Sequence, residues 1–148
     1  MAQGQSTIGK KILLEAYETL NDCSVHFGVY QTHSRSCSSC GAPWNQANEK
    51  MTDVNIAVEM LSAAFKDEFD TALLVSADSD LAPAVQKTME LFDKRVVIAF
   101  PPKRKSYRLR TLASGFTNIS RTQLAKSQLP PTVTRQDGFV LQCPASWT

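Results

Sequence analysis

Apolar side chains recur along this chain in two patterns, one with helical spacing and one continuous. The helical pattern is clearest in residues 53–65, where one stripe consists of Val54, Ala57, Val58, Leu61, Ala64 and Phe65. Such a stripe predicts an amphipathic helix, and Thr52 or Asp53 is placed to cap its start. A similar spacing in residues 10–20 predicts an earlier helix.

The continuous pattern occupies residues 72–75 and 96–100, which are apolar without alternation. Runs of this kind are typical of parallel strands that are buried on both faces. Between the two runs, residues 83–92 predict a helix with a proline near its start. Three shorter elements are expected further on: a helix that Ser106 caps and that continues through Ala113, a strand at residues 116–119 and a helical turn at residues 121–126.

The remaining segments are less regular. Residues 24–31 have the composition of a strand, with Gly28 as a candidate bulge, and residues 32–48 are expected to be a loop. Residues 1–9 are small and polar and are expected to be disordered. We predict one domain at residues 10–129 and an irregular C-terminal tail at residues 130–148. The candidate anchors that pack this tail on the domain are Phe139, Val140, Leu141 and Trp147.

The alternation of helices and strands predicts an α/β fold, a three-layer α/β/α domain with a mostly parallel central sheet and right-handed crossovers. The 148 residues suffice for one domain with a core, and 43% apolar and 20% charged residues are ordinary for a globular protein. No apolar run has the length of a membrane span, and no signal peptide pattern opens the chain. Four cysteines, two of them closely paired, favour a reducing compartment, and we expect the cytoplasm.

Three aspartates are the best candidates for chemistry. Asp78 and Asp80 follow the strand at residues 72–75, and Asp53 opens the helix after the first predicted strand. The carboxyl ends of parallel strands share one rim of a sheet, so the three side chains are expected to converge there. Their mutual repulsion favours divalent cations between them, and oxygen ligands suit Mg²⁺ or Mn²⁺. Such metals activate water for phosphodiester hydrolysis.

Two other interpretations of these aspartates remain open. Asp53 and Asp80 are both placed where an acidic residue caps or begins a helix. An Asp-x-Asp pair after an apolar strand also occurs in haloacid-dehalogenase-type phosphatases. Those enzymes normally carry Thr or Val two residues after the second aspartate, where this chain has Ala82.

Basic residues gather in one short segment, although the net charge of +2 does not by itself indicate a nucleic-acid-binding protein. The segment contains Lys103, Arg104, Lys105, Arg108 and Arg110. It follows the carboxyl end of a predicted strand, near the acidic rim, and leads into a helix whose first amides attract anions. Arg104, Lys105 and Arg108, together with Lys50, are candidates to contact phosphates, and Tyr107 offers a ring on which a base stacks. The alternative is a solvated basic loop.

The cysteine pair is a separate candidate site. Cys37 and Cys40 are two residues apart and are followed by Gly41, which is half of a zinc knuckle, and His33 stands four residues earlier. A structural zinc needs four ligands. His26 on the preceding strand is a candidate fourth ligand, whereas Cys23 and Cys143 lack knuckle spacing. The alternatives are a loop joined through a partner chain and two free thiols.

Two acidic motifs together resemble the NYN domain, a family of PIN-like nucleases. They are Glu49-Lys-Met-Thr-Asp-Val-Asn-Ile-Ala57 and Phe69-Asp-Thr-Ala-Leu-Leu-Val-Ser-Ala-Asp-Ser-Asp80, and residues 94–102 and 127–130 resemble later parts of bacterial members. The similarity begins near Ile12. It implies a metal-dependent ribonuclease with a central parallel sheet, with RNA as the substrate and Mg²⁺ or Mn²⁺ as the cofactor. Asp53, Asp78 and Asp80 match the acidic metal-binding positions of the family.

The chain departs from the family at its start. Members open with a strand that ends in an Asp-Gly-x-Asn motif, and nothing before Lys10 resembles it. We therefore expect the N-terminal strand and one metal ligand to be missing, and activity to be reduced or absent. An exposed strand edge predicts a homo-oligomer. The competing hypotheses are a catalytically inactive module that binds nucleic acid or a protein, and a small-molecule phosphohydrolase.

Overall fold

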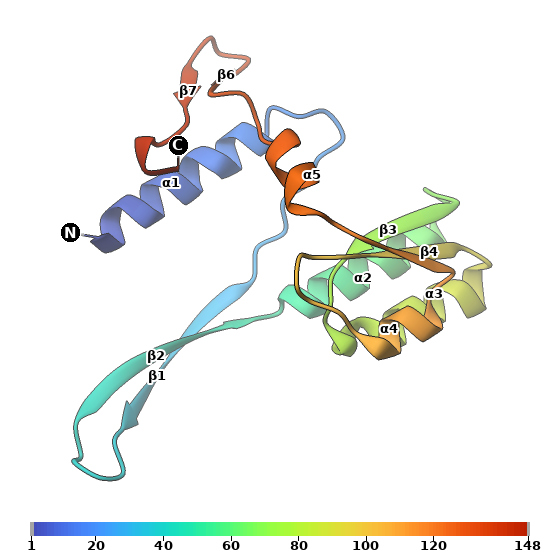
Figure 1. The fold of residues 1–148 in the computed structure, drawn as a ribbon, viewed down its shortest axis with the longest axis horizontal. Helices are drawn as coiled ribbons and strands as arrows, with labels where there is room; N and C mark the ends of the chain where they lie inside the picture. The colour runs from blue at the N-terminus through green and yellow to red at the C-terminus, as the bar shows by residue number, and fades with distance from the viewer. Residues whose placement is uncertain (1, 148) are drawn as a thin grey trace. The chain divides into compact units, whose positions relative to one another are not determined.

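The computed structural model describes residues 2–147, with side chains described for residues 9–147. Two compact units can be recognised (Figure 1). Residues 27–123 form the first, which we call the sheet unit, and residues 1–26 with 124–148 form the second, the terminal unit. Since this division differs from the predicted domain of residues 10–129, that boundary stays a prediction.

The sheet unit is built on three parallel strands in the order β3-β4-β5. These are β3 (Thr71–Val75), β4 (Arg95–Phe100) and β5 (Gly115–Asn118). The helices around them are α2 (Thr52–Phe65), the 3₁₀ turn η1 (Ser79–Leu81), α3 (Ala82–Phe92) and α4 (Tyr107–Leu112). Continuous apolar runs had predicted β3 and β4, so the α/β class and the parallel pairing of these strands are confirmed.

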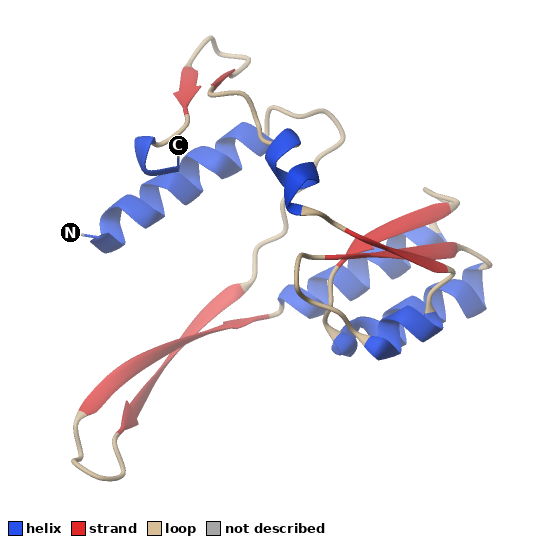
Figure 2. Ribbon diagram, in the orientation of Figure 1, coloured by secondary structure: helices blue, strands red, loops and turns tan. Residues whose placement is uncertain are grey.

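The core of the sheet unit lies on one face of the sheet. Alternate strand residues point into it, and its most buried members are Leu81, Val85, Val96, Ile98, Phe100 and Leu109. Figure 2 shows α2, α3 and α4 on the same side of the strands. On β3, Leu74 is 9% exposed whereas its neighbour Leu73 is 62% exposed. Within the described part of the sheet unit, helices thus cover one face, and the third layer stays a prediction.

The strand β3 forms an outer edge of this sheet. Among the described residues, β4 is the strand with which it pairs. The backbone groups on its other side are therefore open to a further strand, which is the situation that had suggested an oligomer. The absence of the family's first strand and a homo-oligomer through this edge both stay predictions.

A long antiparallel hairpin precedes α2, where a strand and a loop had been expected. It consists of β1 (Val29–Ser36) and β2 (Pro43–Lys50), paired from Val29 opposite Lys50 to Ser36 opposite Pro43. The predicted strand at residues 24–31 overlaps β1 only at residues 29–31, and the predicted loop at residues 32–48 is wrong, because most of it lies in β1 and β2. The strands are rich in polar residues, and nearly every side chain is exposed. Backbone hydrogen bonds therefore hold the hairpin, and its sequence shows no alternation of apolar and polar residues that would have predicted it.

The base of the hairpin is tied to the start of α2. The side-chain amide of Asn55 donates a hydrogen bond to the carbonyl of Phe27 at 3.1 Å. A Cβ atom on Gly28 would lie 2.5 Å from the hydroxyl of Thr52 and 2.8 Å from the carbonyl of Lys50. Gly28 is therefore needed for this close approach, and it lies before β1 rather than in a bulge.

The terminal unit contains α1 (Ala2–Tyr17), a short hairpin of β6 (Thr132–Thr134) and β7 (Val140–Gln142), and the turn η2 (Ala145–Trp147). The helix α5 (Arg121–Lys126) leads into it. Residues 2–9 are helical instead of disordered, because extending a nucleated helix costs little. The hairpin also corrects the expectation of an irregular tail.

Side chains of α1 and the C-terminal segment hold the terminal unit together. Leu141, a predicted anchor, is 4% exposed, and Ala16 is 5% exposed. The guanidinium of Arg135 lies 3.2 Å from the carboxylate of Glu15. The other predicted anchors, Phe139, Val140 and Trp147, stay partly exposed. No helix among the described residues is long and apolar enough to span a membrane.

Candidate functional site

The turn after β3 fixes the orientation of Asp78. Its carboxylate accepts a hydrogen bond from the backbone N–H of Asp80 at 2.9 Å, which caps η1. The backbone N–H of Asp78 donates in turn to the hydroxyl of Ser76 at 3.0 Å. The capping role that had been considered for Asp80 thus belongs to Asp78, and one oxygen of this carboxylate is already held by the backbone.

Asp53 lies in the first turn of α2 and does not cap it. The capping position is occupied by Met51, whose φ is 75° and which provides no side-chain hydrogen bond. The hydroxyl of Thr52 donates to the carboxylate of Glu49 at 2.6 Å. The prediction that Thr52 or Asp53 caps α2 is therefore wrong. An acidic side chain at this position is favourable beside the positive end of the helix dipole.

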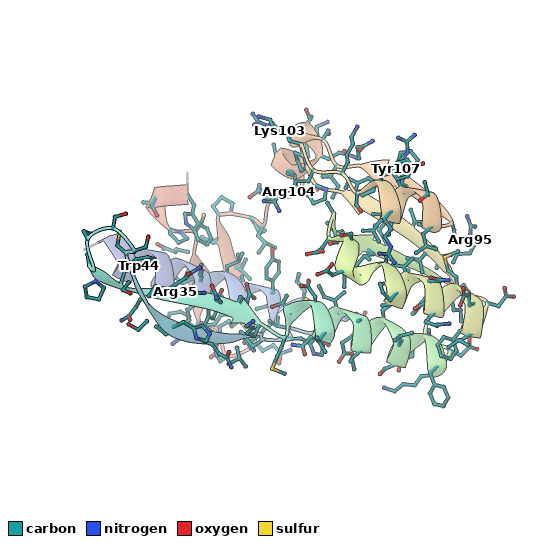
Figure 3. All side chains as sticks on the ribbon, turned by 90° about the horizontal axis from the view of Figure 1, so that it is seen from below. Arg35, Trp44, Arg95, Lys103, Arg104 and Tyr107 are labelled. Atoms are coloured by element: carbon teal, nitrogen blue, oxygen red, sulfur yellow. The ribbon has the colours of Figure 1, made fainter. Side chains whose placement is uncertain are left out.

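The loop after β4 carries the basic residues and is closed by its own hydrogen bonds. The backbone N–H of Arg104 donates to the carbonyl of Pro101 at 3.1 Å. Ser106 then caps α4 as expected, because its hydroxyl accepts from the N–H of Leu109 at 3.4 Å. In Figure 3, Lys103 and Arg104 lie on this loop, at the opposite end of β4 from Arg95. The basic side chains are therefore at the carboxyl end of the strand.

These three segments enclose an open cavity of about 670 Å³ at the carboxyl ends of β3 and β4. Its lining consists of Asp53, Val75, Ser76, Ala77, Asp78, Ser79, Pro101, Lys103, Arg104 and Lys105. Two carboxylates and three cationic side chains therefore face one space, although they are far apart in the sequence. Lys103 had been noted only as a member of the basic segment. Ser76 and Ser79 had not been singled out, and their only signal was proximity to the acidic motif.

Other candidates lie outside the cavity. Asp80 does not line it, and neither do Lys50 and Arg108. Arg108 is exposed on α4, and Tyr107 at the start of that helix is 82% exposed. Figure 3 shows the Tyr107 side chain at the surface. The structure thus divides the predicted site into a central set and a peripheral set.

The donor atoms at the cavity decide how a metal fits there. Among the described residues, no three or more His, Cys, Asp or Glu side chains are grouped closely enough to hold a metal ion. A cage of three aspartates is thus not formed. Mg²⁺, however, is commonly held by one or two carboxylates, with waters and substrate phosphates completing its shell. Asp53 and Asp78 fit this sparser type of site.

The cysteine pair lies elsewhere, in the turn that joins β1 to β2. Cys37 and Cys40 are free thiols, as are Cys23 and Cys143. His33 lies within β1, opposite Gln46, and four residues of strand separate it from Cys37 by roughly 13 Å. His26 precedes the hairpin. The structure therefore does not bring His33 to the two thiols.

The fold and the site together define an α/β protein with acidic and basic side chains at the carboxyl edge of a parallel sheet. Residues 14–120 match the NYN domain, and the chain belongs to this family and so to the PIN-like superfamily. The resemblance noted in the sequence is confirmed. A nuclease-type function is what this family suggests.

Two other similarities were found. The chain is 25% identical over 146 residues to 6-hydroxy-3-succinoylpyridine 3-monooxygenase HspA of Pseudomonas putida, a match that covers 94% of this chain and 46% of that protein. The chain thus spans about half the length of this relative. A protein of unknown function from Vibrio parahaemolyticus, known from its crystal structure, is 26% identical, with a TM-score of 0.43 over 59% of this chain and 47% of that one.

Proposed function

We propose that this chain is a metal-dependent ribonuclease of the NYN type, which cleaves phosphodiester bonds in RNA. The observation that supports this most is the common cavity, where Asp53 and Asp78 face Lys103, Arg104 and Lys105. Metal-dependent phosphodiester cleavage uses both charges, because carboxylates hold the metal and cationic side chains hold the phosphate backbone. We also propose that the protein is cytoplasmic, because its four free thiols suit a reducing compartment.

Asp53 and Asp78 would hold Mg²⁺ or Mn²⁺ between α2 and the turn after β3. When bound, the ion supplies an activated water and stabilises charge on the leaving oxygen. Asp78 is prepared for this role, because the N–H of Asp80 fixes one of its oxygens and leaves the other available. Asp80 would influence the site only through this backbone contact.

The three cationic residues of the loop after β4 would position the RNA. An open cavity of about 670 Å³ has the size of ligand sites, roughly 300–1,000 Å³, and its openness allows a polymer to pass through. Lys50 and Arg108 lie outside the cavity and would contact phosphates further along the RNA strand. Tyr107 offers an exposed ring against which a base would stack.

One observation favours the inactive interaction module as the second candidate. Among the described residues, two carboxylates line the cavity, those of Asp53 and Asp78, and Asp80 does not. A site with fewer ligands holds a metal more weakly, so binding of RNA without cleavage is the natural alternative. The monooxygenase activity in the name of the relative belongs to a protein of which this chain spans about half.

The test is incubation of the purified chain with single-stranded RNA and Mn²⁺, beside the Asp53→Asn and Asp78→Asn variants. Asp137→Asn is the matched control, because Asp137 is an exposed aspartate of the terminal unit. Cleavage that is lost in both site variants and kept in the control supports the proposal. Salt-dependent binding without cleavage would contradict it in favour of the inactive module. Turnover of a phosphomonoester, with RNA left intact, would indicate a phosphohydrolase instead.

A further inference from the structure

The turn that joins β1 to β2 holds two thiols in a defined geometry. The N–H of Cys37 donates to the carbonyl of Ala42 at 3.0 Å, which closes the hairpin beyond the last strand pair. The N–H of Gly41 donates to the carbonyl of Cys37 at 2.9 Å. Gly41 has a φ of +71°, which L residues rarely adopt, so glycine is required here for the backbone conformation. The six residues from Cys37 to Ala42 thus form a fixed turn.

Cys37 and Cys40 both belong to this turn, and both are free thiols. The thiolate is the form of cysteine that binds metal ions. Cys40 is exposed and Cys37 is partly exposed, and neither belongs to the hydrophobic core.

Two thiolates supply half of the tetrahedral shell that a structural zinc requires. The described part of this chain contains no group of three metal-ligating side chains that would supply more, and His33 is too far along β1. The other two ligands must therefore come from outside the hairpin. A second copy of the same turn supplies them with the correct chemistry and with two-fold symmetry.

Charge at the hairpin end fits this arrangement. Four thiolates around one Zn²⁺ leave an excess of two negative charges. Arg35 lies opposite Trp44, one pair before the end of the ladder, and Figure 3 shows both side chains on the hairpin. Two copies would thus bring two guanidinium groups beside the anionic centre. Trp44 is 50% exposed and offers an apolar surface that a second copy would cover.

We propose that Cys37 and Cys40 bind zinc and that two copies of this chain share one ion through their hairpin turns, in a site of four thiolates. Binding exchanges thiol protons for the metal and needs no oxidant. The site is independent of the cavity at the carboxyl ends of β3 and β4. Zinc here would pair two chains rather than take part in hydrolysis.

The experiment uses the full chain, reduced and freed of metal with a chelator, then titrated with Zn²⁺ or Co²⁺. We expect one ion per two chains, a doubling of the mass in light scattering, and the visible absorption of tetrahedral Co²⁺ with thiolate ligands. Cys37→Ser and Cys40→Ser should each abolish all three, with unchanged far-ultraviolet circular dichroism. Cys23→Ser and Cys143→Ser are the matched controls, because both cysteines are exposed and lie outside the hairpin.

Three outcomes would overturn the proposal: the absence of a thiolate spectrum, one ion per chain at the monomer mass, and binding that the control substitutions remove. Arg35→Glu gives a further test that keeps both thiols. It is expected to weaken the zinc-dependent dimer at least about tenfold, because it places like charges together. Dimerisation as strong as in the unaltered chain would refute the proposed packing of the two turns.

Discussion

The carboxylate of Asp78 accepts the backbone N–H of Asp80 at 2.9 Å, and of these two aspartates only Asp78 lines the cavity. The Asp-x-Asp pair is therefore not symmetric. A 3₁₀ turn begins directly after Asp78, so the chain turns away before the second carboxylate reaches the cavity. One aspartate faces the cavity, and the other shapes the turn that holds it.

The first prediction separates these two aspartates. Asp78→Asn should weaken Mn²⁺ binding by roughly tenfold to a hundredfold, the loss seen even when only a partner of a metal ligand is changed. Asparagine caps as well as aspartate does, so stability should be nearly unchanged, whereas Asp78→Ala should cost about 1 kcal/mol. Asp80→Asn keeps its backbone N–H and should leave Mn²⁺ affinity unaltered. Calorimetric titration measures the Mn²⁺ affinity, and urea unfolding measures the stability. Equal losses of Mn²⁺ affinity in Asp78→Asn and Asp80→Asn would contradict the asymmetry of the pair.

The second prediction concerns the loop after β4. Each of Arg104→Gln and Lys105→Gln should weaken RNA binding and reduce the slope of log K against log salt by about 0.7, the value for one phosphate contact on a single strand. Lys126→Gln, in α5, is the control, because it removes an exposed charge outside the cavity. Fluorescence anisotropy at several salt concentrations measures the slopes. If the control changes the slope as much as the loop variants do, the loop has no special role.

The fold of the sheet unit was predictable where side chains are buried. Continuous apolar residues identified β3 and β4, because burial against helices requires them. The hairpin of β1 and β2 was missed, since its strands are polar and exposed and carry no hydrophobic period. Gly41 was a usable signal for the turn of this hairpin, because glycine readily adopts the left-handed backbone conformation that such a turn needs.

Part of the site was predictable from the sequence. For Asp53, however, the reason that led to the prediction was wrong. Asp53 had been placed at the rim because a sheet strand was expected before α2. A hairpin outside the parallel sheet stands there instead, and Asp53 reaches the cavity because α2 begins at the carboxyl edge of β3. The exclusion of Asp80 depends on the path of a single 3₁₀ turn, which residue spacing does not reveal.

A third prediction follows from Lys94, whose side chain is only 11% exposed. Its ammonium group is hydrogen-bonded to the carboxylate of Asp67 and lies 3.7 Å from that of Asp70. The hydrogen bond from Lys94, strengthened by its charge, lowers the pKa of Asp67, and the hydrogen bond to Asp67 raises the pKa of Lys94. The Asp67 contribution to stability is therefore present above its unfolded-state pKa and is lost as pH falls through the folded-state pKa.

The Lys94 contribution has the opposite sign, since it is complete below the unfolded-state pKa of the lysine and is lost as pH rises through the higher folded-state value. Asp67→Asn should therefore flatten the dependence of the unfolding free energy on pH at both ends. Asn tolerates the left-handed backbone at this position, where φ is 60°. Asp93→Asn is the matched control, with a φ of 52° and no ion pair found among the described residues. Urea unfolding across the pH range tests this, and parallel curves for the two variants would contradict it.

The last prediction concerns Thr88, which is fully buried in α3 and whose hydroxyl has no hydrogen-bond partner among the described residues. A threonine inside a helix usually donates to the carbonyl four residues earlier, and a buried hydroxyl without a partner costs about 1–3 kcal/mol. Thr88→Val keeps the shape of the side chain and removes that cost, so the free energy of unfolding should rise by about 1 kcal/mol. Thr88→Ser is the control, because it keeps the hydroxyl and loses a buried methyl group, and it should destabilise by about 1 kcal/mol. Urea unfolding measures both variants. A loss of stability in Thr88→Val would mean that the hydroxyl forms a hydrogen bond after all, and that α3 packs on the sheet differently from the arrangement described above.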